Sequence, residues 1–173
     1  VHAYGSYHME HHLHTQQKED PDLGLSAPFP INKASFLRKV TRDLTGQTGL
    51  KQYRRLFSSA FSGKTDGERL KSGWLRLGPN LLINMFFLSA FSILSAWYLY
   101  FFLWFLPSLT WYRFVVRLRN IAEHASVESN DDRLKNTRTT KANLIERAFI
   151  GPYNVNCHLE HHLVVNCPQY NLP

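Results

Sequence analysis

One uncharged run dominates the pattern of apolar and polar positions. Between Arg76 and Arg113 the chain has 36 consecutive residues without Asp, Glu, Lys or Arg, rich in Leu, Phe, Trp and Tyr. A helix that crosses a bilayer needs about 20 apolar residues. The run is therefore too long for one crossing and about right for two. We predict spanning helices over residues 74–94 and 97–116, joined by a turn near Ser95.

Basic residues flank both ends of this predicted hairpin. They are Arg69, Lys71 and Arg76 before it, and Arg113, Arg117 and Arg119 after it. Positive charge gathers on the cytoplasmic side of membrane proteins, so we expect both ends of the hairpin there. Pro107 is expected to kink the second helix. That helix is predicted to continue into the cytosol as far as Ala125.

The remaining segments are polar or amphipathic. A helix is expected over residues 1–15, ended by the breakers at 20–24. Residues 35–57 alternate basic and apolar positions at helical spacing, which predicts two short helices divided by Gly46 and Gly49. Such helices lie in the membrane interface, although a solvated helix packed on its own domain is the alternative. Residues 62–73 and 126–142 are expected to be mostly loop.

Charge and cysteine content narrow the class of protein. Lys and Arg number 20 against 13 Asp and Glu, a net charge of +7. A basic balance fits nucleic acid, an anionic membrane surface or acidic partners, and the uncharged run favours the membrane, so we expect no nucleic acid. The two cysteines make no disulfide framework. Because the chain opens on Val1 without a signal peptide and ends abruptly, we expect it to be an internal fragment of a longer protein.

The strongest chemical signal is a repeated histidine pattern. His-x-x-His-His occurs near each end of the chain, and the two copies are 150 positions apart: His8, His11 and His12, then His158, His161 and His162. Positions i, i+3 and i+4 share one face of a helix, and neutral imidazole binds iron, copper, zinc and nickel. One copy fits chance or a solvated cluster, whereas we interpret two as halves of one metal site. His124 follows Asn120 by four positions and is expected to join it.

At these residues the chain resembles the integral-membrane fatty acid desaturases, whose signature is three histidine boxes around two irons. Tyr7–His12 with Asp20-Pro21-Asp22 is similar to the second box, Arg119–His124 to an N-x-x-x-H element, and Asn156–Leu163 to the third box. The resemblance implies these iron ligands: His8, His11, His12, His124, His158, His161 and His162, with Asn120 acting through water. Glu10 and Glu160, inside the boxes, are expected either to accept hydrogen bonds from ligating histidines or to be simple surface charges.

The chain also departs from that family's pattern. The first box is absent, and His2 and His14 remain as surface or supporting residues. The third box begins with His158 where desaturases fused to a haem domain carry Gln, and Val164-Val165-Asn166 stands where many relatives have Phe-Pro. These departures affect the wall of the expected site and not its ligands.

The fold class expected is an all-α, helical integral membrane protein: a transmembrane hairpin with a cytoplasmic helical cap that carries a histidine-rich di-metal site. Its segments are residues 1–73 with the second box, 74–116 as the hairpin, and 117–173 with the third box. The resemblance implies an oxidoreductase that uses O2 and two iron ions to introduce a double bond into an acyl lipid or acyl-CoA. A small cytochrome or ferredoxin would supply electrons.

The sequence leaves three alternative functions open. A related di-iron enzyme that hydroxylates, ketolates or epoxidises a lipid or carotenoid would share the same ligands. A non-catalytic membrane protein that binds or moves zinc would place metal-binding residues inside the bilayer, whereas the predicted spans hold no His, Asp or Glu. The fragment alone is expected to be inactive, because the absent first box would supply two ligands.

Overall fold

The computed structural model describes residues 2–128 and 130–172, and within them every regular element is helical. This confirms the all-α prediction. The chain divides into two compact units. One comprises residues 1–35 and 115–173, and the other residues 36–114.

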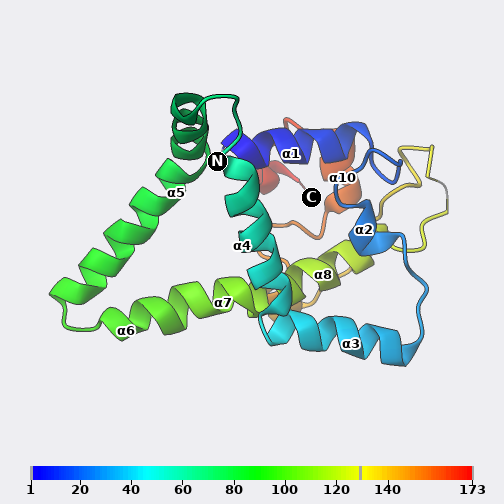
Figure 1. The fold of residues 1–173 in the computed structure, drawn as a ribbon. Helices are drawn as coiled ribbons and strands as arrows, with labels where there is room; N and C mark the ends of the chain where they lie inside the picture. Colours follow the sequence, from blue (N-terminus) through cyan, green and yellow to red (C-terminus); the bar gives the residue numbers. More distant parts are fainter. Residues whose placement is uncertain (1, 129, 173) are drawn as a thin grey trace. The chain divides into compact units, whose positions relative to one another are not determined.

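The first unit contains both histidine repeats. Its helices are α1 (His2–Leu13), α2 (Leu23–Ser26), most of α8 (Trp111–His124), α9 (Leu144–Phe149), α10 (His158–Leu163) and the 3-10 turn η2 (Gln169–Asn171). In Figure 1, α1 and α10 lie side by side, as their histidine contacts require. The expected N-terminal helix is confirmed, although it ends at Leu13, well before the breaker cluster.

The loop after α8 is tied down at both ends. The backbone N–H of Arg138 and the hydroxyl of Thr137 both donate to the carbonyl of Glu123, at 3.0 and 3.2 Å. Thr140 N–H donates to Asn156 O at 3.0 Å, and Asn156 Nδ2 donates back to Thr140 O at 3.1 Å. These bonds hold the segment that precedes α10 against the end of α8, which fixes His158 relative to His124.

The second unit begins with the two predicted amphipathic helices. They are the greater part of α3 (Lys33–Leu44) and all of α4 (Gln47–Ala60). Gly46, at φ +79°, separates them, as expected. The prediction that Gly49 also divides them is wrong, because Gly49 lies inside α4. A Cβ there would collide with the backbone of Leu109, so this glycine allows a close helix contact.

The expected loop over residues 62–73 is also wrong in its second half. Helix α5 (Asp66–Ile93) begins eight residues before Trp74. The reason is a capping box: Thr65 Oγ1 accepts from Glu68 N–H, and Glu68 Oε2 accepts from Thr65 N–H. This reciprocal pair satisfies two backbone donors at the helix start, so the polar residues that follow continue the apolar helix towards its N-terminus.

The turn of the predicted hairpin is confirmed, and its second helix is irregular. Ser95, at φ +55°, turns the chain after α5. The chain then forms α6 (Trp97–Tyr100), a π-helical turn η1 (Phe101–Phe105) and α7 (Leu106–Leu109), with a break at Thr110 before α8. Pro107 has no N–H to donate and crowds the preceding turn, so the irregularity surrounds the expected kink.

The two helical arms on either side of the Ser95 turn are joined by hydrogen bonds. Tyr100 and Trp104 both donate to Asn84 Oδ1 on α5, at 2.7 and 3.2 Å, which joins the two arms of the hairpin. Among the described residues, one helical stretch, Trp97–His124, has the length and apolar composition needed to cross a membrane. Both predicted membrane crossings stay predictions.

Candidate metal centre

The structure brings all seven predicted histidine ligands together within the first unit. They come from the C-terminal turns of α1, the end of α8, and α10. They form two groups: His11, His124, His158 and His162, then His8, His12 and His161, with the candidate ligand atoms of each group within 4.8 Å of one another. The two halves of the histidine pattern are therefore adjacent, and their role as metal ligands stays a prediction.

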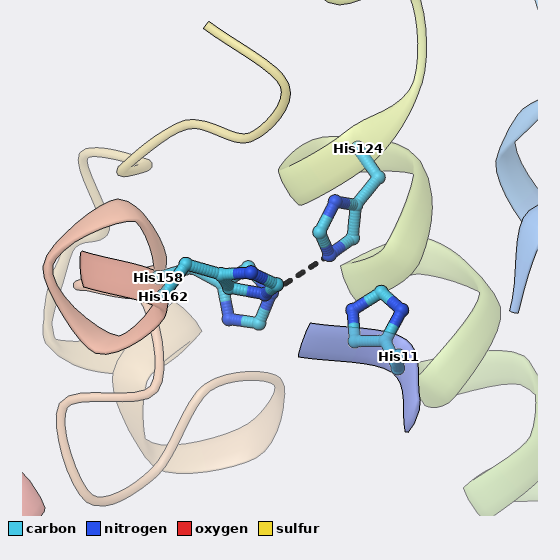
Figure 2. Close-up of side chains that lie close together, drawn as sticks. All are labelled: His11, His124, His158 and His162. Atoms are coloured by element: carbon cyan, nitrogen blue, oxygen red, sulfur yellow. Dashed lines mark hydrogen bonds between the residues drawn. The ribbon is translucent and has the colours of Figure 1, made fainter. Parts of the chain in front are cut away.

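The four-histidine group is the more buried one. His11, His124 and His158 are buried, and only His162 is half-buried. His158 Nε2 lies 2.8 Å from His124 Nε2 and 3.1 Å from His162 Nε2. Figure 2 shows the four rings pointing towards one another from three separate elements, with the contact between His124 and His158 dashed.

The three-histidine group forms a nearly regular triangle of nitrogen atoms. His8 Nε2 lies 3.1 Å from both His12 Nε2 and His161 Nε2, and the remaining pair is 3.0 Å apart. An imidazole nitrogen is either an N–H donor or a lone-pair acceptor. Of three such nitrogens at least two must be alike, so the three contacts cannot all be hydrogen bonds.

A cation resolves this conflict, because it accepts a lone pair from every nitrogen. The centre of a triangle this size lies slightly less than a metal–imidazole bond length of ~2.0–2.1 Å from each corner. His8, His12 and His161 would therefore be able to hold one ion together. Imidazole nitrogen suits iron, copper, zinc and nickel alike, so the donor set fits a transition metal in each group without selecting one.

A buried carboxylate orients one of these histidines. Asp20 Oδ1 lies 2.8 Å from His11 Nδ1, and the two side chains are 0% and 4% exposed. The ring therefore donates Nδ1–H to the carboxylate and keeps its Nε2 lone pair, an arrangement typical of metal-binding histidines. Burial alone would raise the pKa of Asp20, but hydrogen bonds from His11, Gln16 and Asp22 outweigh it and lower that pKa below its ordinary value.

Burial also keeps the histidines neutral. It lowers the pKa of His12 to about 3, with further lowering by the charges that His8 and His161 would carry. Burial is likewise the main cause that lowers the pKa values of His8, His158, His161 and His162, with nearby histidines adding to the effect. Metal binding needs the unprotonated ring, so the fold holds these side chains in the binding form near neutral pH.

The other predicted site residues have more varied surroundings. Asn120 is buried on α8, and its Oδ1 has no hydrogen-bond partner within the described structure, which is compatible with the predicted water-mediated role. Glu10 Oε1 lies 3.6 Å from His14 Nε2, which lies outside both groups. Glu160 accepts a hydrogen bond from Thr139. The side chain of His2 lies outside the described part of the chain.

Two carboxylates in contact with the histidines were not predicted for that role. In the sequence pattern Asp20 counts as a helix breaker and as part of the second box, and Glu123 beside His124 carries no predicted role. Glu123 Oε2 lies 3.6 Å from His158 Nε2, while its Oε1 pairs with Arg119 at 3.1 Å. Sequence spacing points to Glu10 and Glu160 inside the boxes, whereas the carboxylates that approach the rings come from the loop after α1 and from α8.

Comparison with known proteins places the chain in a family. The sequence profile of the family described as fatty acid desaturase matches residues 1–173, the entire chain. No curated protein and no solved structure matches it. With two converging histidine repeats and a family match over its full length, the chain belongs to the fatty acid desaturase family.

Proposed function

We propose that this chain carries the di-iron centre of a membrane-bound acyl-lipid desaturase, an O2-dependent oxidoreductase that introduces a carbon–carbon double bond into an acyl chain. The observation that carries the proposal is the convergence of seven imidazoles in two groups. Family membership supports an oxidoreductase of the desaturase type. The nitrogen triangle, which hydrogen bonding cannot satisfy, supports a bound cation.

In this proposal each group holds one iron. His11, His124, His158 and His162 would bind the first, and His8, His12 and His161 the second, with Asn120 acting through a water molecule. When bound, the two irons would supply the O2-derived oxidizing power that hydrogen removal from an unactivated methylene requires. The protein's own part is to hold neutral imidazoles in place, as Asp20 does for His11, and to admit the substrate.

A cavity beside the four-histidine group supports an acyl substrate. Its volume is about 360 Å³, within the range typical of small-molecule sites. The lining is mostly apolar, with two basic and two acidic side chains: Leu118, Ala122, Ala142 and Ile150, then Arg119 and Lys141, then Glu123 and Glu146. Arg119 pairs with Glu123, which lies 3.6 Å from His158. The apolar part of the lining suits an acyl chain.

The membrane arrangement belongs to the same proposal. Residues 74–116 would cross the bilayer twice, with segments 1–73 and 117–173 and both histidine groups on the cytoplasmic side. Large apolar side chains along α5 support this, since Leu82, Met85 and Phe86 are all more than half exposed. A small cytochrome or ferredoxin on that side would deliver electrons, and no nucleic acid is involved.

Product analysis tests the proposed reaction. The complete gene that contains this sequence would be expressed in cells lacking their own desaturase, and total acyl chains would be analysed by mass spectrometry. We expect a product two mass units lighter than its precursor, and its loss in the His161→Ala and His162→Ala variants, because each removes a ligand. A product heavier by one oxygen, or an unchanged acyl profile with iron bound, would overturn the desaturase assignment.

A further inference from the structure

Thr15 connects the two histidine repeats through one hydroxyl group. It follows the last turn of α1 and is only 4% exposed. Its Oγ1 lies 2.8 Å from the carbonyl oxygen of His11 and 3.2 Å from His162 Nδ1 on α10. A third contact, to the carbonyl of His12, is longer at 3.4 Å. Thr15 thus contacts the backbone of one repeat and an imidazole of the other.

The chemistry of these contacts fixes the tautomer of His162. A hydroxyl has one proton to donate, and a carbonyl can only accept, so Thr15 donates to α1. Its oxygen must then accept from His162, which places the ring proton on Nδ1. The Nε2 atom of His162 consequently keeps its lone pair, and that atom faces the four-histidine group, 3.1 Å from His158 Nε2.

Asp20 imposes the same tautomer on His11, another member of the group. Because a carboxylate only accepts, His11 Nδ1 donates to it at 2.8 Å. Two histidines from opposite ends of the chain therefore present Nε2 lone pairs to one point. In each case the fixing group belongs to residues 15–20, the short segment that follows α1.

We propose that Thr15 is a positioning residue that selects the metal-binding tautomer of His162 by accepting its Nδ1 proton. The proposal rests on the proposed metal role of the histidines. A purely structural Thr15 would only close the last turn of α1. Removing its oxygen would leave His162 Nδ1–H without this acceptor, which favours moving the proton to Nε2, where it blocks the lone pair.

Three variants separate these roles. Thr15→Val removes the hydroxyl at similar volume, and Thr15→Ser retains it. Thr45→Val is the control for the helix bond, because Thr45 Oγ1 donates to the carbonyl four residues earlier at 2.7 Å and accepts from Gln47 and not from a histidine. Thr45 is exposed and Thr15 is buried, so the two variants are compared by tautomer state and metal affinity and not by stability.

The readouts are tautomer state and cobalt affinity. In the metal-free chain, long-range proton–nitrogen NMR spectra of the imidazoles should show His162 protonated on Nδ1 in the wild type, Thr15→Ser and Thr45→Val, and a shift towards Nε2–H in Thr15→Val. Titration with Co²⁺, followed by its visible absorption, should show affinity about 10–100-fold weaker in Thr15→Val, the usual effect of losing a partner behind a ligand.

Different results would contradict the metal centre and the positioning role of Thr15. Wild-type chain that binds no Co²⁺ would contradict the proposed metal centre, while the NMR result would still decide the tautomer claim. An unchanged tautomer in a folded Thr15→Val chain, or equal Co²⁺ affinity in Thr15→Val and Thr45→Val, would overturn the positioning role. Should Thr15→Val fail to fold, Thr15→Ala read by the same NMR spectra decides it, and Nδ1–H retained there also overturns the role.

Discussion

Asp20→Asn is the most informative single change outside the histidines. The Asp20 carboxylate is fully buried and accepts three hydrogen bonds: His11 Nδ1 and Asp22 N–H at Oδ1, and Gln16 N–H at Oδ2, each at 2.8 Å. Asparagine has nearly the same shape, but one of its two positions becomes an NH2 donor. The substitution therefore changes hydrogen bonding and charge without creating a cavity.

The loss of stability in Asp20→Asn can be worked out from the buried donors that lose an acceptor. With the asparagine oxygen at the Oδ1 position, its NH2 meets the N–H of Gln16, and one buried donor loses its acceptor. The flipped amide leaves the Asp22 N–H without its acceptor and forces the His11 ring proton off Nδ1. One unsatisfied buried donor costs about 1–3 kcal/mol, and a chain of this size loses about 2–4 °C of melting temperature per kcal/mol. We therefore expect the melting temperature to fall by at least about 2 °C, with Co²⁺ affinity reduced about 10–100-fold.

The assay is thermal unfolding of the detergent-solubilised chain at pH 7, with and without Co²⁺. Asp66→Asn is the control, because the Asp66 side chain is 96% exposed and pairs with Arg69 only at 3.6 Å, an arrangement that contributes little. The Asp20 contribution should persist down to the ordinary carboxyl pKa and disappear below it, because folding lowers the pKa of Asp20. Equal melting temperatures and Co²⁺ affinities for the two variants at pH 7 would refute the reasoning.

Three further predictions concern pH, packing and topology. Burial lowers the pKa of His12 to about 3, so below pH ~6.5 the unfolded chain binds more protons than the folded chain. The metal-free fold should therefore lose stability as the pH falls from about 6.5 towards 3. Melting temperatures measured by circular dichroism at stepped pH check this, and a melting temperature that does not change with pH would contradict it. Gly49→Ala should lower the free energy of unfolding by about 1–3 kcal/mol, because the added methyl group overpacks against the α7 backbone. Gly67→Ala, where nothing lies within 4 Å, should leave that free energy unchanged or raise it. Chemical denaturation compares the two variants, and equal effects would contradict the close contact at Gly49. In sealed vesicles an impermeant thiol reagent should label Cys167 from the cytoplasmic side and a Leu94→Cys variant from the opposite side; labelling of both from one side would exclude the hairpin.

Features that depend on neighbours along the chain could be predicted from the sequence. Apolar runs and breakers predicted the helices and the turn at Ser95, because helix formation and turn chemistry act over a few residues. The i, i+3, i+4 spacing put each set of three imidazoles on one helix face. The start of α5 was equally local, since Thr65 and Glu68 form a capping box that spacing alone could have revealed.

The tertiary structure alone decided how the histidines are shared out and held. Each repeat contributes to both groups: α1 gives His11 to the four-histidine group and His8 and His12 to the other, whereas α10 gives His158 and His162 to the first and His161 to the second. No spacing rule predicts that division, because it depends on how α1, α8 and α10 pack. Asp20 and Thr15 likewise acquire their roles only when the loop after α1 folds back beside α10, since a hydrogen bond between residues 147 positions apart leaves no periodic trace in the sequence.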